Sequence, residues 1–149
     1  MELQKPDETP ELEDIVYLIE AGKLPAGIIF VVREYDESAY IWIAPRLEYY
    51  VDLLLQKYPE LSIAVVSHGD EILALTSTNE IEYAGVHDTV RRITEKYGVD
   101  FQVCGAFAAF NGLSESDFPS FIDVVPYGPS SISDYRSLNF ELIDLELTW

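Results

Sequence analysis

The chain contains a single cysteine, Cys104, in the stretch "FQVCGAF", where an apolar run gives way to glycine and the expected start of a helix. The free amides and the dipole at a helix start stabilise an anion, so a thiol placed there is expected to be more reactive than an ordinary one. A free cysteine is also a common small core residue. The position of Cys104 therefore supports a nucleophile, with inert packing as the open alternative.

A histidine and a glycine, His68 and Gly69, follow a second apolar run in "AVVSHGD". A thiol hydrolase or transferase that used His68 to activate Cys104 would need both side chains within hydrogen-bonding reach. The other histidine, His87, is expected in the first turn of a helix, a poor place for a cation, and is assigned no role. Carboxylates near His68 carry little weight because the chain has 27 of them; they are Asp36, Asp70 and Glu71.

Several familiar motifs are absent from the sequence. It has no HEXXH pattern, no glycine-rich dinucleotide fingerprint, no P-loop and no CxxC pair. One cysteine cannot close an internal disulfide or supply a zinc site from thiolates alone. No metal and no cofactor is therefore predicted, and any sulfur chemistry must use Cys104 singly or across chains.

Length and charge limit the kinds of partner. A chain of 149 residues fits one domain, and a formal charge of −18 repels nucleic acid and polyanionic membranes while attracting basic protein surfaces.

The longest apolar stretch, "AGIIFVV", is far shorter than the roughly 20 residues of a bilayer helix. The opening residues lack the features of a secretory signal, which predicts a cytoplasmic protein, or a periplasmic one if a signal was removed.

The pattern of apolar residues predicts an N-terminal extension, residues 1–25, and one α/β domain, residues 26–149. The extension carries an amphipathic helix from Thr9 and Pro10 to Gly22, which either packs on its own domain or contacts another subunit. Strands and helices then alternate, and the last helix is expected to have a serine cap. The predicted strands are 27–32, 61–67, 99–104, 122–126 and a probable edge strand, 141–147; the predicted helices are 38 or 45 to 58, 71–76, 86–98, 106–112 and 130–139.

This alternation implies a doubly wound, three-layer sandwich with a mainly parallel sheet of five strands. Such sheets bind ligands at the carboxyl ends of their strands, which places Cys104 and His68 at the functional edge. The residues expected to line a cleft there are Tyr35, Asp36, Phe107 and Tyr127.

The stretch "AVVSHGDEILALT", followed by "VRRITEKYGVDFQVCGAFAAFNGLSESDFPSFIDVVPYGPSSISDYRSLNFELIDL", resembles the DsrE/DsrF-like family of sulfur-transfer proteins. The shared features are a strand ending in His-Gly, a strand ending in Cys, a "GLS" segment and a "VVPSG"-like segment before the last helix. The resemblance covers roughly residues 27 to 146. Two departures are Tyr127, where a small polar residue is commoner, and the first 25 residues, which extend beyond the usual core.

This resemblance implies a flavodoxin-like subunit that assembles into trimers or hexamers and carries sulfane sulfur as a persulfide on Cys104. Donor and acceptor proteins would be its partners. The amides of Gly105 and Ala106 are expected to stabilise the anionic sulfur. His68 ranks second, because the expected strand order 2-1-3-4-5 puts the first strand between His68 and Cys104. The alternative is a small-molecule-binding, regulatory or structural subunit of the same fold.

Overall fold

A computed structural model describes residues 3–22 and 24–147 and contains one sheet of five strands, in the order β4-β3-β2-β1-β5. Every neighbouring pair is parallel. The predicted fold class, a five-stranded parallel α/β sandwich with an N-terminal helix, is confirmed. The strands are β1 (Gly27–Val32), β2 (Ser62–Ser67), β3 (Asp100–Cys104), β4 (Asp123–Val125) and β5 (Phe140–Leu145).

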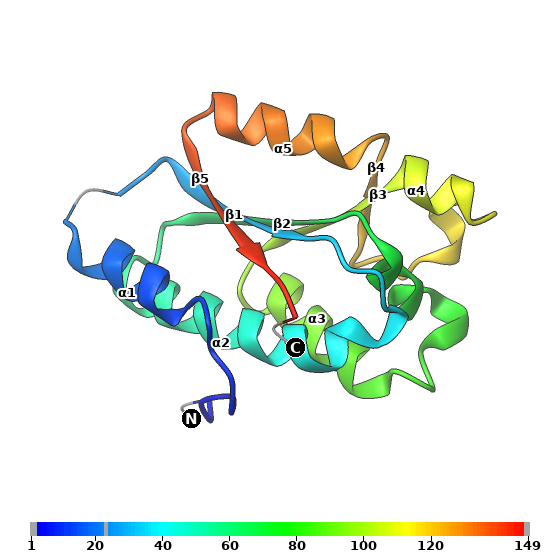
Figure 1. The fold of residues 1–149 in the computed structure, drawn as a ribbon, viewed down its shortest axis with the longest axis horizontal. Coiled ribbons are helices and arrows are strands. Elements are labelled where there is room, and N and C mark those ends of the chain that lie inside the picture. The colour runs from blue at the N-terminus through cyan, green and yellow to red at the C-terminus, as the bar shows by residue number, and fades with distance from the viewer. Residues whose placement is uncertain (1–2, 23, 148–149) are drawn as a thin grey trace.

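Helices cover both faces of the sheet, which accounts for the uninterrupted apolar sequence of its central strands. Figure 1 shows α1, α2 and α3 on one face and α5 on the other, so the fold has three layers. The α-helices are α1 (Leu12–Glu20), α2 (Tyr40–Lys57), α3 (Ala84–Glu95), α4 (Gly105–Phe110) and α5 (Gly128–Ser137). Short 3-10 helices span Glu37–Ala39, Asp70–Leu75, Ser77–Asn79 and Glu115–Asp117.

The strand order differs from the expected 2-1-3-4-5. β2 pairs with both β1 and β3, so the expectation that the first strand separates the second from the third is wrong. The chain places β2, β3 and β4 each beside the strand before it, and α5 then carries it across the sheet to β5 at the opposite edge. His68 and Cys104 consequently stand at the ends of adjacent strands.

Two apolar cores lie on the two faces of the sheet. The larger one, beneath α1, α2 and α3, contains the side chains predicted to point inward from α3, which are Val86, Val90 and Ile93. The smaller one lies beneath α5 and is built on Ile29, Val31 and Val66. The sheet is therefore held from both sides, and its strand ends are fixed in position.

The N-terminal helix begins later than predicted, at Leu12, with Glu11 rather than Thr9 at the cap position. Thr9 instead accepts a hydrogen bond from the amide of Leu12 in the preceding turn. Ile15 is fully buried and α1 packs against α2, which fits the expectation that this helix covers its own domain. Residues 1, 2 and 23 of the predicted extension, and residues 148 and 149, lie outside the described residues.

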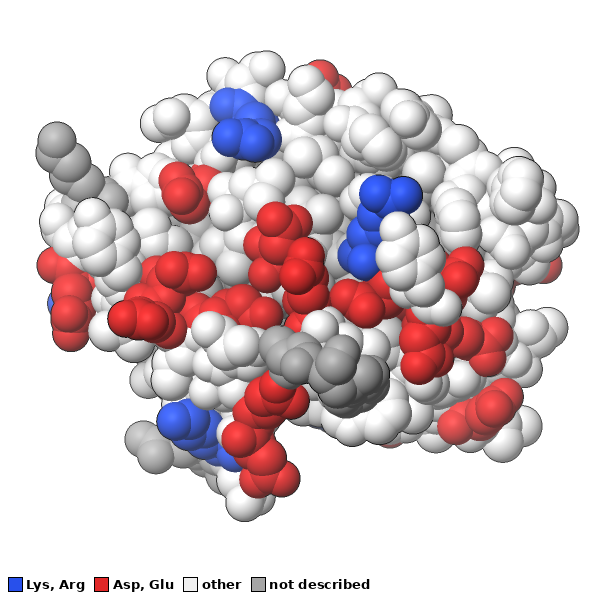
Figure 2. All heavy atoms as spheres, in the orientation of Figure 1, with Lys and Arg blue, Asp and Glu red and all other residues white. Residues whose placement is uncertain are grey.

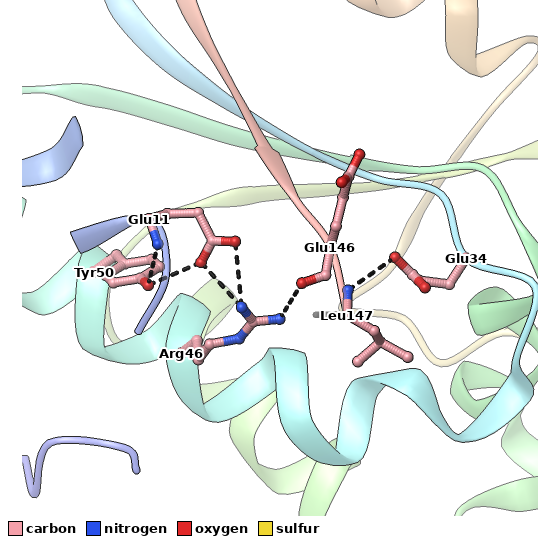
Figure 3. A network of polar contacts seen from close by, with 6 residues as sticks. All are labelled: Glu11, Glu34, Arg46, Tyr50, Glu146 and Leu147. Carbon is pink, nitrogen blue, oxygen red and sulfur yellow. Dashed lines mark hydrogen bonds and ion pairs between the residues drawn. The ribbon is translucent and has the colours of Figure 1, made fainter. Parts of the chain in front are cut away.

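A buried arginine joins the segments at the two ends of the chain (Figure 3). Arg46 of α2 donates to both carboxylate oxygens of Glu11, at 3.1 and 3.2 Å, and to the carbonyl of Glu146, at 2.8 Å. The hydroxyl of Tyr50 also donates to Glu11. Beyond β5, the amide of Leu147 donates to the carboxylate of Glu34, which links the C-terminal segment to the loop after β1.

Candidate functional site

A cavity of about 500 Å³ opens at the carboxyl ends of β1, β2 and β3. This is the edge where parallel α/β sheets bind their ligands. The cavity brings together residues from the loops after these strands, from α4 and from the start of α5. Its lining residues are Arg33, Glu34, Tyr35, His68, Gly69, Asp70, Cys104, Ala106, Phe107, Phe110, Tyr127 and Pro129.

Cys104 lies at the end of β3 with only 3% of its surface exposed. Its Sγ accepts a hydrogen bond of 3.2 Å from the amide of Gly128, the first residue of α5. The cap residue of α5, Tyr127, offers no side-chain hydrogen bond, so the sulfur takes the position of a capping acceptor. The positive end of the α5 dipole therefore points at the sulfur.

Among the described residues, no hydrogen bond joins the sulfur to the amides predicted to stabilise it, those of Gly105 and Ala106. The amide of Ala106 donates to the carbonyl of Pro126 at 3.1 Å, so this amide is engaged elsewhere. A β-carbon on Gly105 would stand 2.6 Å from the carbonyl oxygen of Val125, which explains why this position is glycine. The donor that the structure gives the sulfur is Gly128. The predicted serine cap of α5 is also wrong, because the helix already begins at Gly128.

His68 and Cys104, at the ends of adjacent strands, both lie close to Gly128. A β-carbon built on Gly128 would be 3.1 Å from the β-carbons of both residues, so the backbone at the start of α5 packs closely against both strand ends. Burial and the nearby charge of Arg33 lower the pKa of His68, which keeps the imidazole neutral near pH 7. Within the described part of the chain, no hydrogen bond joins this imidazole to Cys104, so the contact required for a His68-activated hydrolase is missing.

Arg33 provides a cation at the cavity. Its guanidinium lies 5.9 Å from the centre of the Tyr35 ring, and no carboxylate among the described residues forms an ion pair with it. Figure 2 shows that acidic side chains far outnumber basic ones on the face it draws. Arg33 lines the same cavity as Cys104, and in a chain with a net charge of −18 its charge partly offsets that of the cavity carboxylates of Glu34 and Asp70.

Aromatic residues form the outer wall of the cavity. Tyr35 and Phe110 are 81% and 86% exposed, Tyr127 is 52% exposed, and Phe107 stacks on Phe110 with ring centres 6.4 Å apart. The predicted positions of Tyr35, Phe107 and Tyr127 are thus in the lining. Phe110 was not predicted, although its place three residues after Phe107 on a short helix puts the two rings on one side.

Asp36, predicted for the cleft, does not line the cavity. Its carboxylate accepts hydrogen bonds from the amide and the hydroxyl of Ser38, at 2.9 and 2.7 Å. These bonds cap the short helix Glu37–Ala39 and lower the pKa of Asp36. The side chain therefore serves the local turn.

A model of the DsrE/DsrF-like family matches residues 28–143. The chain belongs to this family. The matched range contains every strand apart from the ends of β1 and β5, and it includes Arg33, His68, Cys104 and Gly128. Glu11 and Glu146, which Arg46 joins, lie outside it.

Two solved structures share the fold. One is a protein of unknown function from Methanobacterium thermoautotrophicum, MTH1491, with a TM-score of 0.62 and 23% identity over 79% of this chain and 97% of that one. The other is a conserved protein of unknown function from Bacteroides thetaiotaomicron, BT1422, with a TM-score of 0.55 and 13% identity over 78% and 93% of the two chains. A comparison with curated proteins gave no match.

None of the helices in the described residues has the length and apolar character required to cross a bilayer. Within the same residues, no cluster of three or more histidine, cysteine, aspartate or glutamate side chains is arranged to hold a metal ion.

Proposed function

We propose that this protein carries sulfane sulfur as a persulfide on Cys104 and passes it from a donor to an acceptor. The observation that carries the proposal is the hydrogen bond from the amide of Gly128 to Sγ of Cys104 at the floor of an open cavity. A core cysteine needs neither a helix terminus pointed at its sulfur nor a cavity beside it. Membership of the DsrE/DsrF-like family adds support for sulfur relay as the context.

The transfer runs in two displacements. The thiolate of Cys104 attacks the outer sulfur of a donor persulfide, the sulfur–sulfur bond of the donor breaks, and the donor leaves as a thiolate. An acceptor thiolate then attacks the outer sulfur of the Cys104 persulfide and releases the Cys104 thiolate. Each step exchanges one sulfur–sulfur bond for another, so no external oxidant or reductant is consumed.

The neighbouring groups stabilise the anionic states of this cycle. The Gly128 amide and the α5 dipole act on the sulfur of Cys104 itself. Arg33 lines the space into which the outer sulfur would extend, and its charge favours the anion that forms there. The neutral imidazole of His68 is available to accept or donate one hydrogen bond at the same wall.

The proposal also covers the setting in which the carrier works. We assign it sulfur donor and acceptor proteins as partners, a trimeric or hexameric assembly and a cytoplasmic location, where an unpaired thiol stays reduced. Residues 1–25 are proposed as an extension of the domain formed by residues 26–149. The trimeric or hexameric assembly is proposed from membership of the DsrE/DsrF-like family. Light scattering coupled to size-exclusion chromatography tests it, and a monomer at all concentrations would exclude it.

A second candidate function is binding of a small molecule, with Cys104 as packing. The cavity volume falls in the range of ligand pockets, and the aromatic side chains of Tyr35, Phe107, Phe110 and Tyr127 suit an apolar or aromatic ligand. On this alternative the thiol stays unreactive.

The deciding experiment is intact-protein mass spectrometry after incubation with inorganic polysulfide, with and without reductant, on the native protein and on Cys104→Ser. A gain of sulfur on the native protein that reductant removes, and none on the variant, supports the carrier. No gain on either protein, together with failure of iodoacetamide to modify Cys104, contradicts it and favours the binding function.

A further inference from the structure

We propose that Glu71 is the positioning residue of this site: its carboxylate joins the loops after β1 and β2 and so fixes His68 and Arg33 beside Cys104. The inference rests on the proposed function for its activity readout. Glu71 is the second residue of the short helix Asp70–Leu75 and has no exposed surface. It is not among the lining residues of the cavity, so it acts through the residues that are.

The carboxylate of Glu71 collects hydrogen bonds from both loops. Its Oε1 accepts from the amide of Glu34, two residues beyond β1, at 2.7 Å. Its Oε2 accepts from the amide of Gly69 at 2.9 Å and from the hydroxyl of Ser67, the last residue of β2. One side chain therefore holds the residues that immediately flank Arg33 on one loop and His68 on the other.

A hydroxyl relay extends this arrangement into the core. The hydroxyl of Tyr40 donates to Oγ of Ser67 at 2.8 Å, which leaves the hydroxyl hydrogen of Ser67 for Glu71. Tyr40 and Ser67 are both fully buried. Because every hydrogen bond to the two carboxylate oxygens is a donation toward them, the arrangement suits the ionised form of Glu71.

Gly69 shows that the backbone is shaped around this carboxylate. A β-carbon at position 69 would lie 2.5 Å from Oε1 of Glu71 and 2.5 Å from the carbonyl oxygen of Glu34. Any larger residue would push the two loops apart. The same carbonyl accepts from the amide of Asp70 at 2.8 Å, so the loops are also joined directly.

Packing alone does not explain a carboxylate at this position. The pKa of Glu71 is raised because burial disfavours its charged form, although the hydrogen bonds from Ser67, Glu34 and Gly69 favour that form. A buried charge without a cation costs stability relative to an apolar side chain. The ordering of two backbone amides and a hydroxyl at the wall of the cavity accounts for a charged side chain at this buried position.

The test is Glu71→Gln, which keeps the shape and replaces one acceptor oxygen with a donor. Its matched control is Glu141→Gln, which removes the same charge from an exposed position on β5. Two quantities are measured: the rate of sulfur uptake by Cys104 from inorganic polysulfide, and the pKa of the His68 imidazole from its NMR titration. We expect a loss of rate of about tenfold or more, and a His68 pKa that rises toward its ordinary value as the loop loosens and water enters. The control should change neither.

The direction of the His68 shift distinguishes positioning from other effects. Removal of a negative charge without loop movement would leave the His68 pKa unchanged or lower it, and that result overturns the proposal even if the rate falls. If the native protein takes up no sulfur, the carrier function fails while the titration still decides the role of Glu71. If Glu71→Gln does not fold, Ser67→Ala removes one of the three donors, and a smaller change in the same directions is expected; no change in the His68 pKa then overturns the proposal.

Discussion

The amide of Gly128 donates a 3.2 Å hydrogen bond to Sγ of Cys104, although the two residues are 24 positions apart in the chain. This contact joins the end of β3 to the start of α5, and His68 lies close to the same glycine. It makes the environment of the thiol depend on close backbone packing and not on a flexible side chain.

Gly128→Ala should disturb this packing. Its new methyl group would meet the β-carbons of Cys104 and His68 at 3.1 Å, so both neighbours must give way by a few tenths of an ångström. We expect slower sulfur uptake at Cys104 and a loss of about 1–3 kcal/mol in the free energy of unfolding. Urea denaturation and mass spectrometry measure the two effects. Gly85→Ala is the matched control, since its β-carbon meets no atom within 4 Å and alanine favours the helix; equal behaviour of the two variants would refute the prediction.

The imidazole of His68 should titrate below its ordinary pKa of 6.5, because burial and Arg33 disfavour its charged form. The folded protein then binds this proton less readily than the unfolded chain. The free energy of unfolding therefore falls as the pH drops below 6.5 and continues to fall until the folded-state pKa is reached. His68→Ala should remove this part of the pH dependence in urea denaturation. An NMR titration midpoint at or above 6.5 would contradict the assignment.

Arg33→Gln should raise the pKa of His68, because the guanidinium is one of the two causes that lower it. It should also slow sulfur uptake from anionic polysulfide by a few-fold, since one charge near a protein surface contributes on the order of 1 kcal/mol. Added salt should reduce the difference between variant and native protein. Arg136→Gln removes an exposed arginine on α5 and serves as the control. A salt-independent rate difference would argue against an electrostatic role for Arg33.

Arg46→Gln should destabilise the protein far more than Arg136→Gln. It leaves the carboxylate of Glu11 buried without its cation and the carbonyl of Glu146 without its donor. Removal of one partner of a buried ion pair costs about 3–5 kcal/mol, which urea denaturation detects as a lower midpoint. Similar midpoints for the two variants would mean that the ends of the chain contribute little to stability.

Much of this fold follows from local sequence patterns. Continuous β-branched runs such as "GIIFVV" identified strands that are buried on both faces, and Val86, Val90 and Ile93 identified the inner face of α3. The order of strands is not a local property. It depends on which face each crossover covers, and that is why the placement of β2 between β1 and β3 was missed.

Only part of the site could be predicted, because some of its contacts also depend on how distant segments are arranged and not on local sequence. Cys104, His68 and the aromatic residues could be placed because they follow strands, and strand ends meet at one edge. Gly128 could not be identified as the sulfur donor from residues adjacent to Cys104, and Ala106 was chosen wrongly because the partner of its amide, Pro126, lies on another segment. Glu71 was one carboxylate among 27, and what distinguishes it is its full burial together with hydrogen bonds from both loops.

The crossover through α5 has a consequence for the newly made chain. Cys104 is synthesised before Gly128, and α5 is fixed over the sheet through the strand that follows it, β5, which pairs with β1. A chain still emerging from the ribosome therefore holds its thiol without the amide that faces it in the finished fold. Only a chain that has been synthesised through β5 brings the sulfur and its donor together, so the thiol acquires this hydrogen bond after β5 has paired with β1.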